Sequence, residues 1–212
     1  MSLRPPGRQD LLKAASLNSL DLTEEDLEGF QSLVPGIFEH LESLDQMPKE
    51  QPHLKDVVRD PGSRPPPEDD PLNAIVRRCS VRGTDSGKLA GVRVGLKDTI
   101  SIAGVPMTCG SRVLSGFTPD IDATVVTRIL GEGGEVVAIL NMDDFAWAGS
   151  GETSAYGPVL NPHNTKHLAG GSSAGSAAAL YYDDIDITLG GDQGGSIRIP
   201  AAFSGIVGHK PT

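Results

Sequence analysis

The chain has 212 residues, of which 38% are hydrophobic, and its mean hydropathy is −0.16, which suits a globular protein of one large or two small domains. Its formal net charge of −10 and its pI of about 4.9 argue against direct contact with nucleic acid or with anionic membrane surfaces. The two cysteines, Cys79 and Cys109, form no metal-binding pattern and no disulfide framework, and no window approaches the ~20 apolar residues of a membrane helix. We therefore expect a cytoplasmic protein without a membrane segment, in which both cysteines are small buried side chains.

The N-terminal region, residues 1–58, is predicted to be helical. Thr23 is a good N-cap, and the acidic residues at 24–26 suit the first turn of a helix. Apolar residues then recur at helical spacing as far as Leu44, with an interruption at Pro35-Gly36. This pattern predicts two short amphipathic helices. Packing of their apolar stripe on the chain's own core is favoured over binding to a partner.

Residues 59–71 read RDPGSRPPPEDDP and are rich in proline and charge. Such a segment has too little apolar surface to fold by itself, so we predict a linker that runs over a surface.

The remaining residues, 72–212, follow an α/β pattern. GVRVGLKDTISIAGV alternates like a strand followed by turns, and DATVVTRILGEGGEVVAIL predicts a helix, a glycine break and a buried strand. SAAAL predicts a helix, and DIDITLGGD predicts a strand that ends in glycines. Strands that alternate with helices indicate a layered α/β domain.

Two stretches in this domain combine glycine pairs with serine: GGSSAGSAAAL from Gly170 and GGDQGGSIRIP from Gly190. Repeated glycine indicates a turn or a close approach of the backbone to another group. A phosphate-binding loop is one interpretation, because both stretches contain the frame GxxxxG. Ser176 and Ser196, however, stand where such a loop needs a lysine, which argues against a nucleotide-binding site.

A serine nucleophile is the second interpretation. Residues 171–175 match GxSxG, which would make Ser173 the nucleophile of an α/β-hydrolase elbow. That mechanism needs a histidine later in the chain, and only His209 follows. We expect all the histidines to be ordinary loop or surface residues, since no spacing indicates a metal site: His40, His53, His163, His167 and His209.

The third interpretation includes Lys97, which ends an apolar strand where a charged group would be costly to bury. Alone, it could equally reach solvent or pair with Asp98. Four blocks nevertheless occur in a characteristic order: GVRVGLKDTISIAGVPMTCGS, NMDDFAWAGSGETSAYGPVLNPHN, GGSSAGSAAAL and GGDQGGSIRIPAAFSGIVGHKPT. On these blocks the chain resembles the amidase signature family over residues 71–212.

The resemblance implies a Ser-cis-Ser-Lys triad. Lys97 would be the base, Ser172 the bridging serine after a cis peptide bond, and Ser196 the nucleophile. A serine attacks only when a base takes its proton, so Lys97 must be uncharged. Lowering a lysine pKa from its ordinary value to about 7 costs roughly 5 kcal/mol, and burial beside Val94 and Leu96 could supply this shift.

The resemblance also implies how the oxyanion is bound. Its hole would be formed by backbone N–H groups of Gln193, Gly194, Gly195 and Ser196, because small residues let the backbone come close. Ser173 would form hydrogen bonds near the nucleophile, while Asp192 and Arg198 would maintain the shape of the loop. The implied reaction is hydrolysis of a small-molecule carboxylic amide through an acyl ester on Ser196, without metal or organic cofactor. The implied fold is an α/β/α sandwich around a mixed sheet.

Two departures from the family pattern affect these expectations. Ala138-Ile139-Leu140 stands where the family usually has a Gly-Lys pair, although that lysine is outside the triad. Family members also continue well beyond the last residues of this chain, so we expect an N-terminal portion with an incomplete pocket, exposed apolar sheet surface and little activity alone. A homodimer is one expected assembly. Two functions are alternatives to that of an amidase. The chain could be one component of a complex that amidates Glu-tRNA(Gln), in which case it needs an ammonia-accepting partner, or it could be an inactive interaction module.

Overall fold

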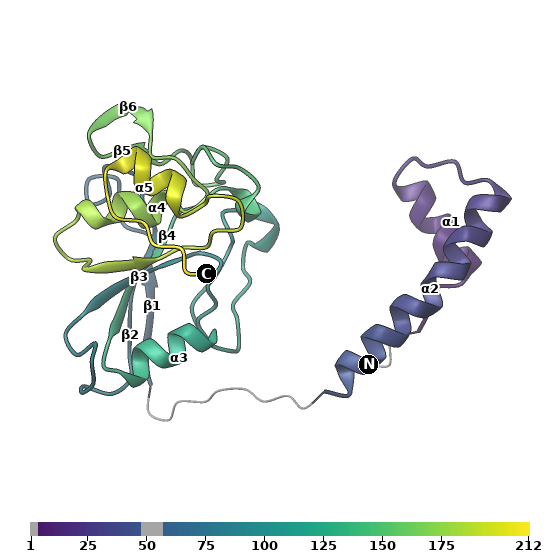
Figure 1. Cartoon of the computed structure of the whole chain (residues 1–212), viewed down its shortest axis with the longest axis horizontal. Helices are drawn as coiled ribbons and strands as arrows, with labels where there is room; N and C mark the ends of the chain where they lie inside the picture. Colours follow the sequence, from purple (N-terminus) through teal and green to yellow (C-terminus); the bar gives the residue numbers. More distant parts are fainter. Residues whose placement is uncertain (1–3, 48–56) are drawn as a thin grey trace. The chain divides into compact units, whose positions relative to one another are not determined.

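The structure, a computed structural model, describes residues 4–47 and 57–212 (Figure 1). The chain divides into two compact units, Met1–Glu50 and Gln51–Thr212. Within the described residues, no helix combines the length and the apolar character needed to cross a membrane.

The first unit contains helices α1 (Arg8–Leu17) and α2 (Glu24–Asp45). Thr23 caps α2 as predicted: its Oγ1 accepts from the Asp26 N–H at 3.2 Å, and the Asp26 carboxylate accepts from the Thr23 N–H at 2.8 Å. The prediction of two helices separated at Pro35 is wrong, since α2 continues through Pro35. A proline removes one main-chain hydrogen bond but has a φ close to the helical value, and here the bonds on either side maintain the helix.

The apolar stripe of α2 is only partly buried. Leu27 is buried, whereas Phe30, Ile37 and Leu44 are exposed. Only the first part of the predicted stripe therefore packs in a core.

We expect Thr23→Ala to destabilise the start of α2 by about 1 kcal/mol, because the Asp26 N–H loses its side-chain acceptor. Amide hydrogen exchange at Asp26 and Leu27, measured by NMR, should then accelerate about fivefold. Ser32→Ala is the control, since Ser32 lies within α2 and its hydroxyl bonds only to the Gly29 carbonyl. Unchanged exchange in Thr23→Ala would contradict the cap.

The second unit is built on a mixed five-stranded sheet in the order β1-β2-β4-β3-β7. Strands β1 and β2 pair antiparallel, as do β2 and β4, whereas β3 pairs parallel with both β4 and β7. The strands are β1 (Val58–Ser63), β2 (Ile75–Arg82), β3 (Arg93–Lys97), β4 (Glu135–Leu140) and β7 (Ile187–Leu189).

Strand β1 corrects the prediction that residues 59–71 form only a linker. Its main chain pairs with β2 from Val58, opposite Arg82, to Ser63, opposite Arg78. The strand lies at the edge of the sheet and is largely exposed. An edge strand needs backbone pairing on one side only, so it tolerates Pro61 and needs few apolar side chains.

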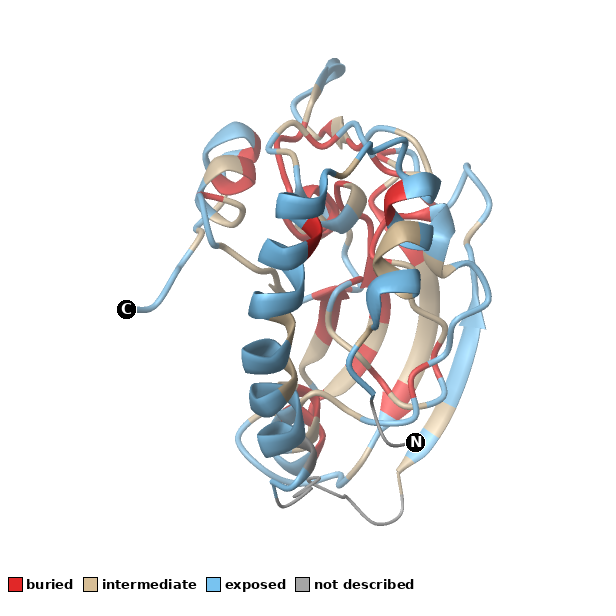
Figure 2. Cartoon of the chain, turned by 90° about the vertical axis from the view of Figure 1, so that its right-hand side faces the viewer, coloured by how far each residue is buried: buried red, intermediate tan, exposed pale blue. Residues whose placement is uncertain are grey.

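Helices cover both faces of the sheet, which agrees with the predicted sandwich. Helix α3 (Thr124–Gly131) packs through Val126 and Leu130 in a cluster with Ile139 of β4. Helix α4 (Ala174–Ala178) packs through its alanines in a second cluster with Leu140 of the same strand. Adjacent residues of a strand point to opposite faces, so the two clusters lie on opposite sides of the sheet. Buried residues gather in the strands and in the segments packed on them (Figure 2).

Shorter elements complete the second unit. Helix α5 (Arg198–Ser204) packs against α4, and β5 (Leu160–Asn161) and β6 (Asn164–Leu168) form a separate hairpin. Three 3-10 turns occupy connections: Arg112–Leu114, Asp144–Ala146 and Ala179–Tyr181.

Candidate active site

The candidate site lies where three parallel strands end. Lys97 is the last residue of β3, Asn141 follows β4, and Gly190 follows β7. Because β3 pairs parallel with β4 and with β7, these residues lie at the same edge of the sheet. The carboxyl edge of parallel strands is the usual ligand-binding edge of open α/β sheets.

Lys97 is buried at this edge and contacts a serine. Its side chain is only 1% exposed, and Nζ donates to Ser172 Oγ at 2.7 Å. Burial lowers the pKa of Lys97 to about 8, against the opposing charges of Asp143 and Asp192. An amine with this pKa is partly uncharged near neutral pH. The pKa is therefore shifted downward, as the predicted role of Lys97 as a base requires.

Ser172 is held in a tight turn that precedes α4. The peptide bond between Gly171 and Ser172 is cis, as the resemblance implies, and Gly170 has a φ of 76°, a left-handed value that favours glycine. A Cβ on Gly171 would collide with Oδ2 of Asp143, so glycine is required there for close approach. The Ser172 carbonyl accepts from the Asp143 N–H at 3.2 Å.

Asp143, which was not among the predicted site residues, lies fully buried in the site. One signal could have revealed it: an acidic residue closely follows a predicted buried strand, as the lysine ends another. Charged side chains at the carboxyl ends of neighbouring parallel strands come together.

Asp192 organises the loop that contains Ser196. Its carboxylate accepts from the backbone N–H groups of Gly195, at 2.7 Å, and Ile197, at 3.1 Å. Arg198 donates to it from Nε and from Nη2, both at 2.9 Å. The Arg198 guanidinium holds the pKa of Asp192 well below its usual range. These contacts have the geometry expected for a pair that maintains the loop.

The same contacts alter the expected oxyanion donors. The Gly195 N–H is directed at Asp192, so the prediction that it points to an oxyanion does not fit this structure. The N–H groups of Gln193, Gly194 and Ser196 donate no hydrogen bond to any residue within 4–47 or 57–212. Three of the four expected donors are therefore unoccupied.

Ser196 lies beside the turn without completing the expected hydrogen-bond chain. Its carbonyl accepts from the Ser173 N–H at 3.1 Å, which joins the two glycine-serine stretches. In the part of the chain that the structure describes, its hydroxyl forms no hydrogen bond with Ser172 or Lys97. The structure thus brings Lys97 and Ser172 into contact and places Ser196 next to Ser173, while the nucleophilic role of Ser196 stays a prediction.

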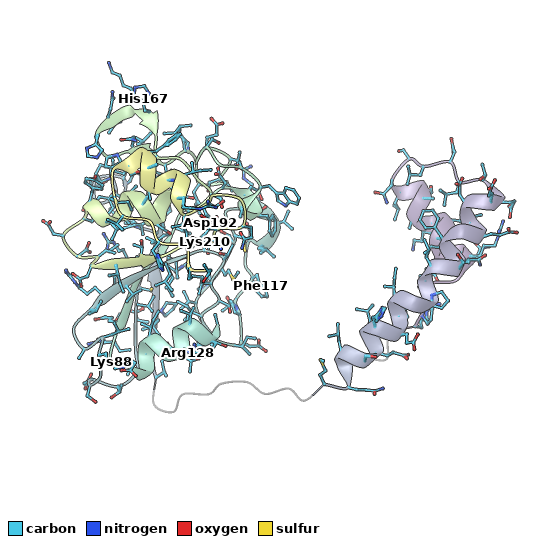
Figure 3. All side chains as sticks on the ribbon, viewed as in Figure 1. Lys88, Phe117, Arg128, His167, Asp192 and Lys210 are labelled. Atoms are coloured by element: carbon cyan, nitrogen blue, oxygen red, sulfur yellow. The ribbon has the colours of Figure 1, made fainter. Side chains whose placement is uncertain are left out.

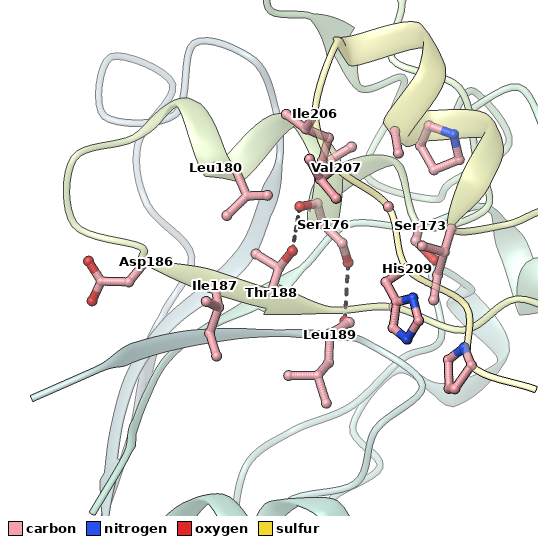
Figure 4. Close-up of a pocket in the computed structure, with 17 residues that line it drawn as sticks. Ser173, Ser176, Leu180, Asp186, Ile187, Thr188, Leu189, Ile206, Val207 and His209 are labelled. Atoms are coloured by element: carbon pink, nitrogen blue, oxygen red, sulfur yellow. Dashed lines mark hydrogen bonds between the residues drawn. The ribbon is translucent and has the colours of Figure 1, made fainter. Parts of the chain in front are cut away.

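Ser173 forms contacts that disfavour the nucleophile elbow. Its hydroxyl donates to the Gly191 carbonyl and accepts from the Gly191 N–H, both at 3.2 Å. Ser173 and His209 line the same groove of about 600 Å³ beside β7, and no hydrogen bond joins them (Figure 4). Ser173 therefore connects two backbone segments.

The other histidines lie outside the site. His163 contacts the Ser204 carbonyl, at 3.0 Å, and the Tyr181 hydroxyl, at 2.7 Å. His167 lies on the exposed hairpin, far from Asp192 (Figure 3). His40 is exposed, and His53 lies outside the described residues.

Both cysteines are free, and Cys109 is buried as predicted, whereas Cys79 is only half-buried. Burial raises the pKa of Cys79 to about 12 and that of Cys109 to about 11. Among the residues that the structure describes, no three His, Cys, Asp or Glu side chains are grouped so that they could hold a metal ion.

Comparison with known proteins relates the second unit to enzymes of one family. A protein of Halobacterium salinarum, named as one of the subunits of glutamyl-tRNA(Gln) amidotransferase, is 48% identical over 141 residues, which cover 66% of this chain and 33% of that protein. Its namesake from Chlamydia pneumoniae is 51% identical over 138 residues, which cover 65% and 28%. The chain thus spans about a third of the length of the curated relatives it matches.

Solved structures share the fold of this unit. The crystal structure of the same amidotransferase subunit from Thermotoga maritima superposes with a TM-score of 0.63 at 40% identity, over 68% of this chain and 32% of that one. Native peptide amidase from Stenotrophomonas maltophilia superposes with a TM-score of 0.56 at 39% identity, over 59% and 27%. The model of the family described as Amidase matches residues 73–212, which are most of the chain. The protein therefore belongs to the Amidase family.

Proposed function

We propose that this site hydrolyses the C–N bond of a carboxylic amide through an acyl ester on Ser196. The observation that carries the proposal is the 2.7 Å contact between the buried Lys97 amine and the Ser172 hydroxyl. A buried lysine with a lowered pKa at the ligand-binding edge of a sheet is a candidate general base.

In the proposed reaction, uncharged Lys97 takes a proton from Ser172, and Ser172 takes one from Ser196. The Ser196 oxygen then forms a bond to the amide carbonyl carbon. When the C–N bond breaks, the proton returns through Ser172 to the leaving nitrogen, and ammonia or an amine departs. Water, activated by the same relay, hydrolyses the ester and restores the serine.

Negative charge develops on the carbonyl oxygen during both attacks, and backbone N–H groups would stabilise it. The unoccupied N–H groups of Gln193, Gly194 and Ser196 are the proposed donors. Asp192 supports them indirectly, because its bonds to Gly195 and Ile197 hold the loop on both sides of Ser196.

The test is covalent labelling by a fluorophosphonate, in which the serine oxygen bonds to phosphorus and fluoride leaves. We expect the labelling rate to rise about tenfold per pH unit and to level above pH 8, because only uncharged Lys97 accepts a proton. Mass spectrometry should locate the label on Ser196.

Ser196→Ala should abolish this labelling, whereas Ser173→Ala, the matched control, should still be labelled at Ser196. A label on Ser173 would support the elbow instead. No labelling of a folded chain would support an inactive interaction module.

A second candidate function is that of one component of an amidotransferase complex, and the names of the curated relatives favour it. Such a component would release ammonia from an amide donor for an ammonia-accepting partner. Ammonia release from glutamine, compared with release from small aliphatic and aryl amides, separates the two candidates. Preference for glutamine, together with recovery of an ammonia-accepting partner in a pull-down, would favour the complex.

A further inference from the structure

Asp143 is a buried acid that the proposed reaction does not use. It follows β4 by three residues and is fully buried. Its Oδ2 accepts from the Gly151 N–H at 2.9 Å, and its Oδ1 accepts from the Thr153 N–H and hydroxyl, both at 3.0 Å. Each of these donors is neutral, and within residues 57–212 no ion pair includes Asp143. Burying a carboxylate costs free energy that hydrogen bonds and nearby positive charge can offset, and here the direct partners supply hydrogen bonds alone.

The turn that contains Ser172 is packed directly on Asp143. The Asp143 N–H donates to the Ser172 carbonyl, and Oδ2 occupies the space that a Cβ on Gly171 would need. On its other side the turn is held by the Gly171 N–H, which donates to the Gly149 carbonyl at 2.8 Å. The main chain of Asp143 thus contacts Ser172, and its side chain packs against Gly171. These two residues are joined by the cis peptide bond.

The charge of Asp143 also acts on Lys97. Burial lowers the pKa of this lysine, and the carboxylate that raises it most strongly is Asp143, followed by Asp192. Asp98 is the next residue after Lys97, but its carboxylate accepts from Thr108 and Gly110. Asp192 is already paired with Arg198. Asp98 also has only neutral donors, but it is not among the groups that raise the pKa of Lys97, which leaves Asp143 as the carboxylate without a cation that acts on this lysine.

We propose that Asp143 is a positioning residue, which holds the Ser172 turn against Lys97 and places a buried negative charge beside the lysine. The inference rests on the proposed function for the use of Lys97 as a base. By favouring the charged amine, Asp143 keeps the lysine basic enough to accept a proton, whereas burial alone would weaken it further.

The test is an NMR titration of Lys97 in the 212-residue chain, labelled with carbon-13 at the lysine ε-carbon. In Asp143→Asn we expect the Lys97 midpoint to fall by about 1 pH unit, because an opposing charge has been removed. Asp98→Asn is the matched control, since it removes an equally buried carboxylate whose hydrogen bonds lead elsewhere. The midpoint should be unchanged in this control. An unchanged or raised midpoint in Asp143→Asn would overturn the role of its charge.

A second variant tests the positioning role and keeps the charge. Thr153→Val removes one hydrogen bond to Oδ1 and also the acceptor of the Asp144 N–H. We expect amide hydrogen exchange at Asp143, which reports its bond to the Ser172 carbonyl, to accelerate about fivefold while the Lys97 midpoint stays constant. Thr108→Val, which removes the equivalent bond to Asp98, is the control. Equal exchange in Thr153→Val and wild type would overturn the positioning role.

Neither measurement depends on turnover. If Ser196 fails to react with the fluorophosphonate while the midpoint falls as expected, the proposed function fails and the inference about Asp143 stands. If Ser196 reacts, the pH range over which its labelling rate rises should move to lower pH in Asp143→Asn, together with the Lys97 midpoint.

Discussion

Lys97→Met should lower the rate of Ser196 labelling about 10³-fold, because the reaction loses its general base. Methionine is similar to lysine in volume but cannot accept a proton. The measurement is the pseudo-first-order rate of labelling by the fluorophosphonate at pH 8, followed by mass spectrometry. The residual rate should no longer depend on pH between 6 and 9, since the titrating group is absent.

The same substitution should not destabilise the fold at pH 7. Lowering the pKa of Lys97 from 10.5 to about 8 costs about 3 kcal/mol while the amine is charged in both states. Methionine avoids this cost but leaves the buried Ser172 hydroxyl without its partner, which costs about 1–3 kcal/mol. We expect the free energy of unfolding to equal or exceed that of the wild type.

The pH dependence of stability provides a further check. Between pH 8 and 10.5 the unfolded chain binds a proton at Lys97 that the native chain has lost, so wild-type stability rises with pH across this window. Relative to wild type, the variant should therefore lose about 3 kcal/mol from pH 7 to pH 11 in urea unfolding. Lys88→Met, at an exposed lysine, should change neither labelling nor this pH dependence. Wild-type labelling by Lys97→Met would contradict the proposed base.

Gly175→Ala should destabilise the second unit by more than about 3 kcal/mol, measured as the free energy of unfolding in urea. Gly175 lies in α4, and a Cβ there would collide with the Ala74 carbonyl oxygen and lie 2.5 Å from the Asn141 nitrogen. Both atoms are backbone at the ends of the central strands, so neither can move without disrupting the sheet. Alanine itself favours the helical conformation, so the expected loss of stability comes from the contacts of α4 with other segments and not from helix propensity.

Gly149→Ala is the matched control, because its Cβ would lie 3.5 Å from the Ile199 side chain and 3.9 Å from the Gly171 carbonyl oxygen, both ordinary contacts. Its free energy of unfolding should stay within about 1 kcal/mol of wild type. If Gly175→Ala were equally stable, the packing of α4 against β2 and β4 would be wrong.

Local patterns were sufficient to predict much of the second unit. The strand that ends at Lys97, the helix–glycine–strand run up to Leu140, and the alanine helix after Ser173 all have the expected character. The Thr23 cap could be read in the same way. Each of these features depends on residues close together in the chain, which is the range over which periodicity and capping act.

Other structural features depend on contacts with segments that local sequence patterns do not identify. Val58–Ser63 becomes a strand because β2 offers a free edge, although its own composition indicates a linker. Helix α2 continues through Pro35 because the bonds on both sides of it persist. The Gly195 N–H is taken by Asp192, which the glycine-rich pattern alone could not indicate.

The chemical groups of this site could be identified from local patterns: a lysine at the end of a strand and two glycine-serine stretches that resemble those of a known family. The contacts between these groups could be found only in the folded chain: Lys97 and Ser172, 75 residues apart, lie 2.7 Å from each other, and the buried Asp143 contacts the turn that holds Ser172. The reason is that the order of the parallel strands brings their carboxyl ends together. Strand order is set by the packing of the whole sheet, which no short stretch of sequence encodes.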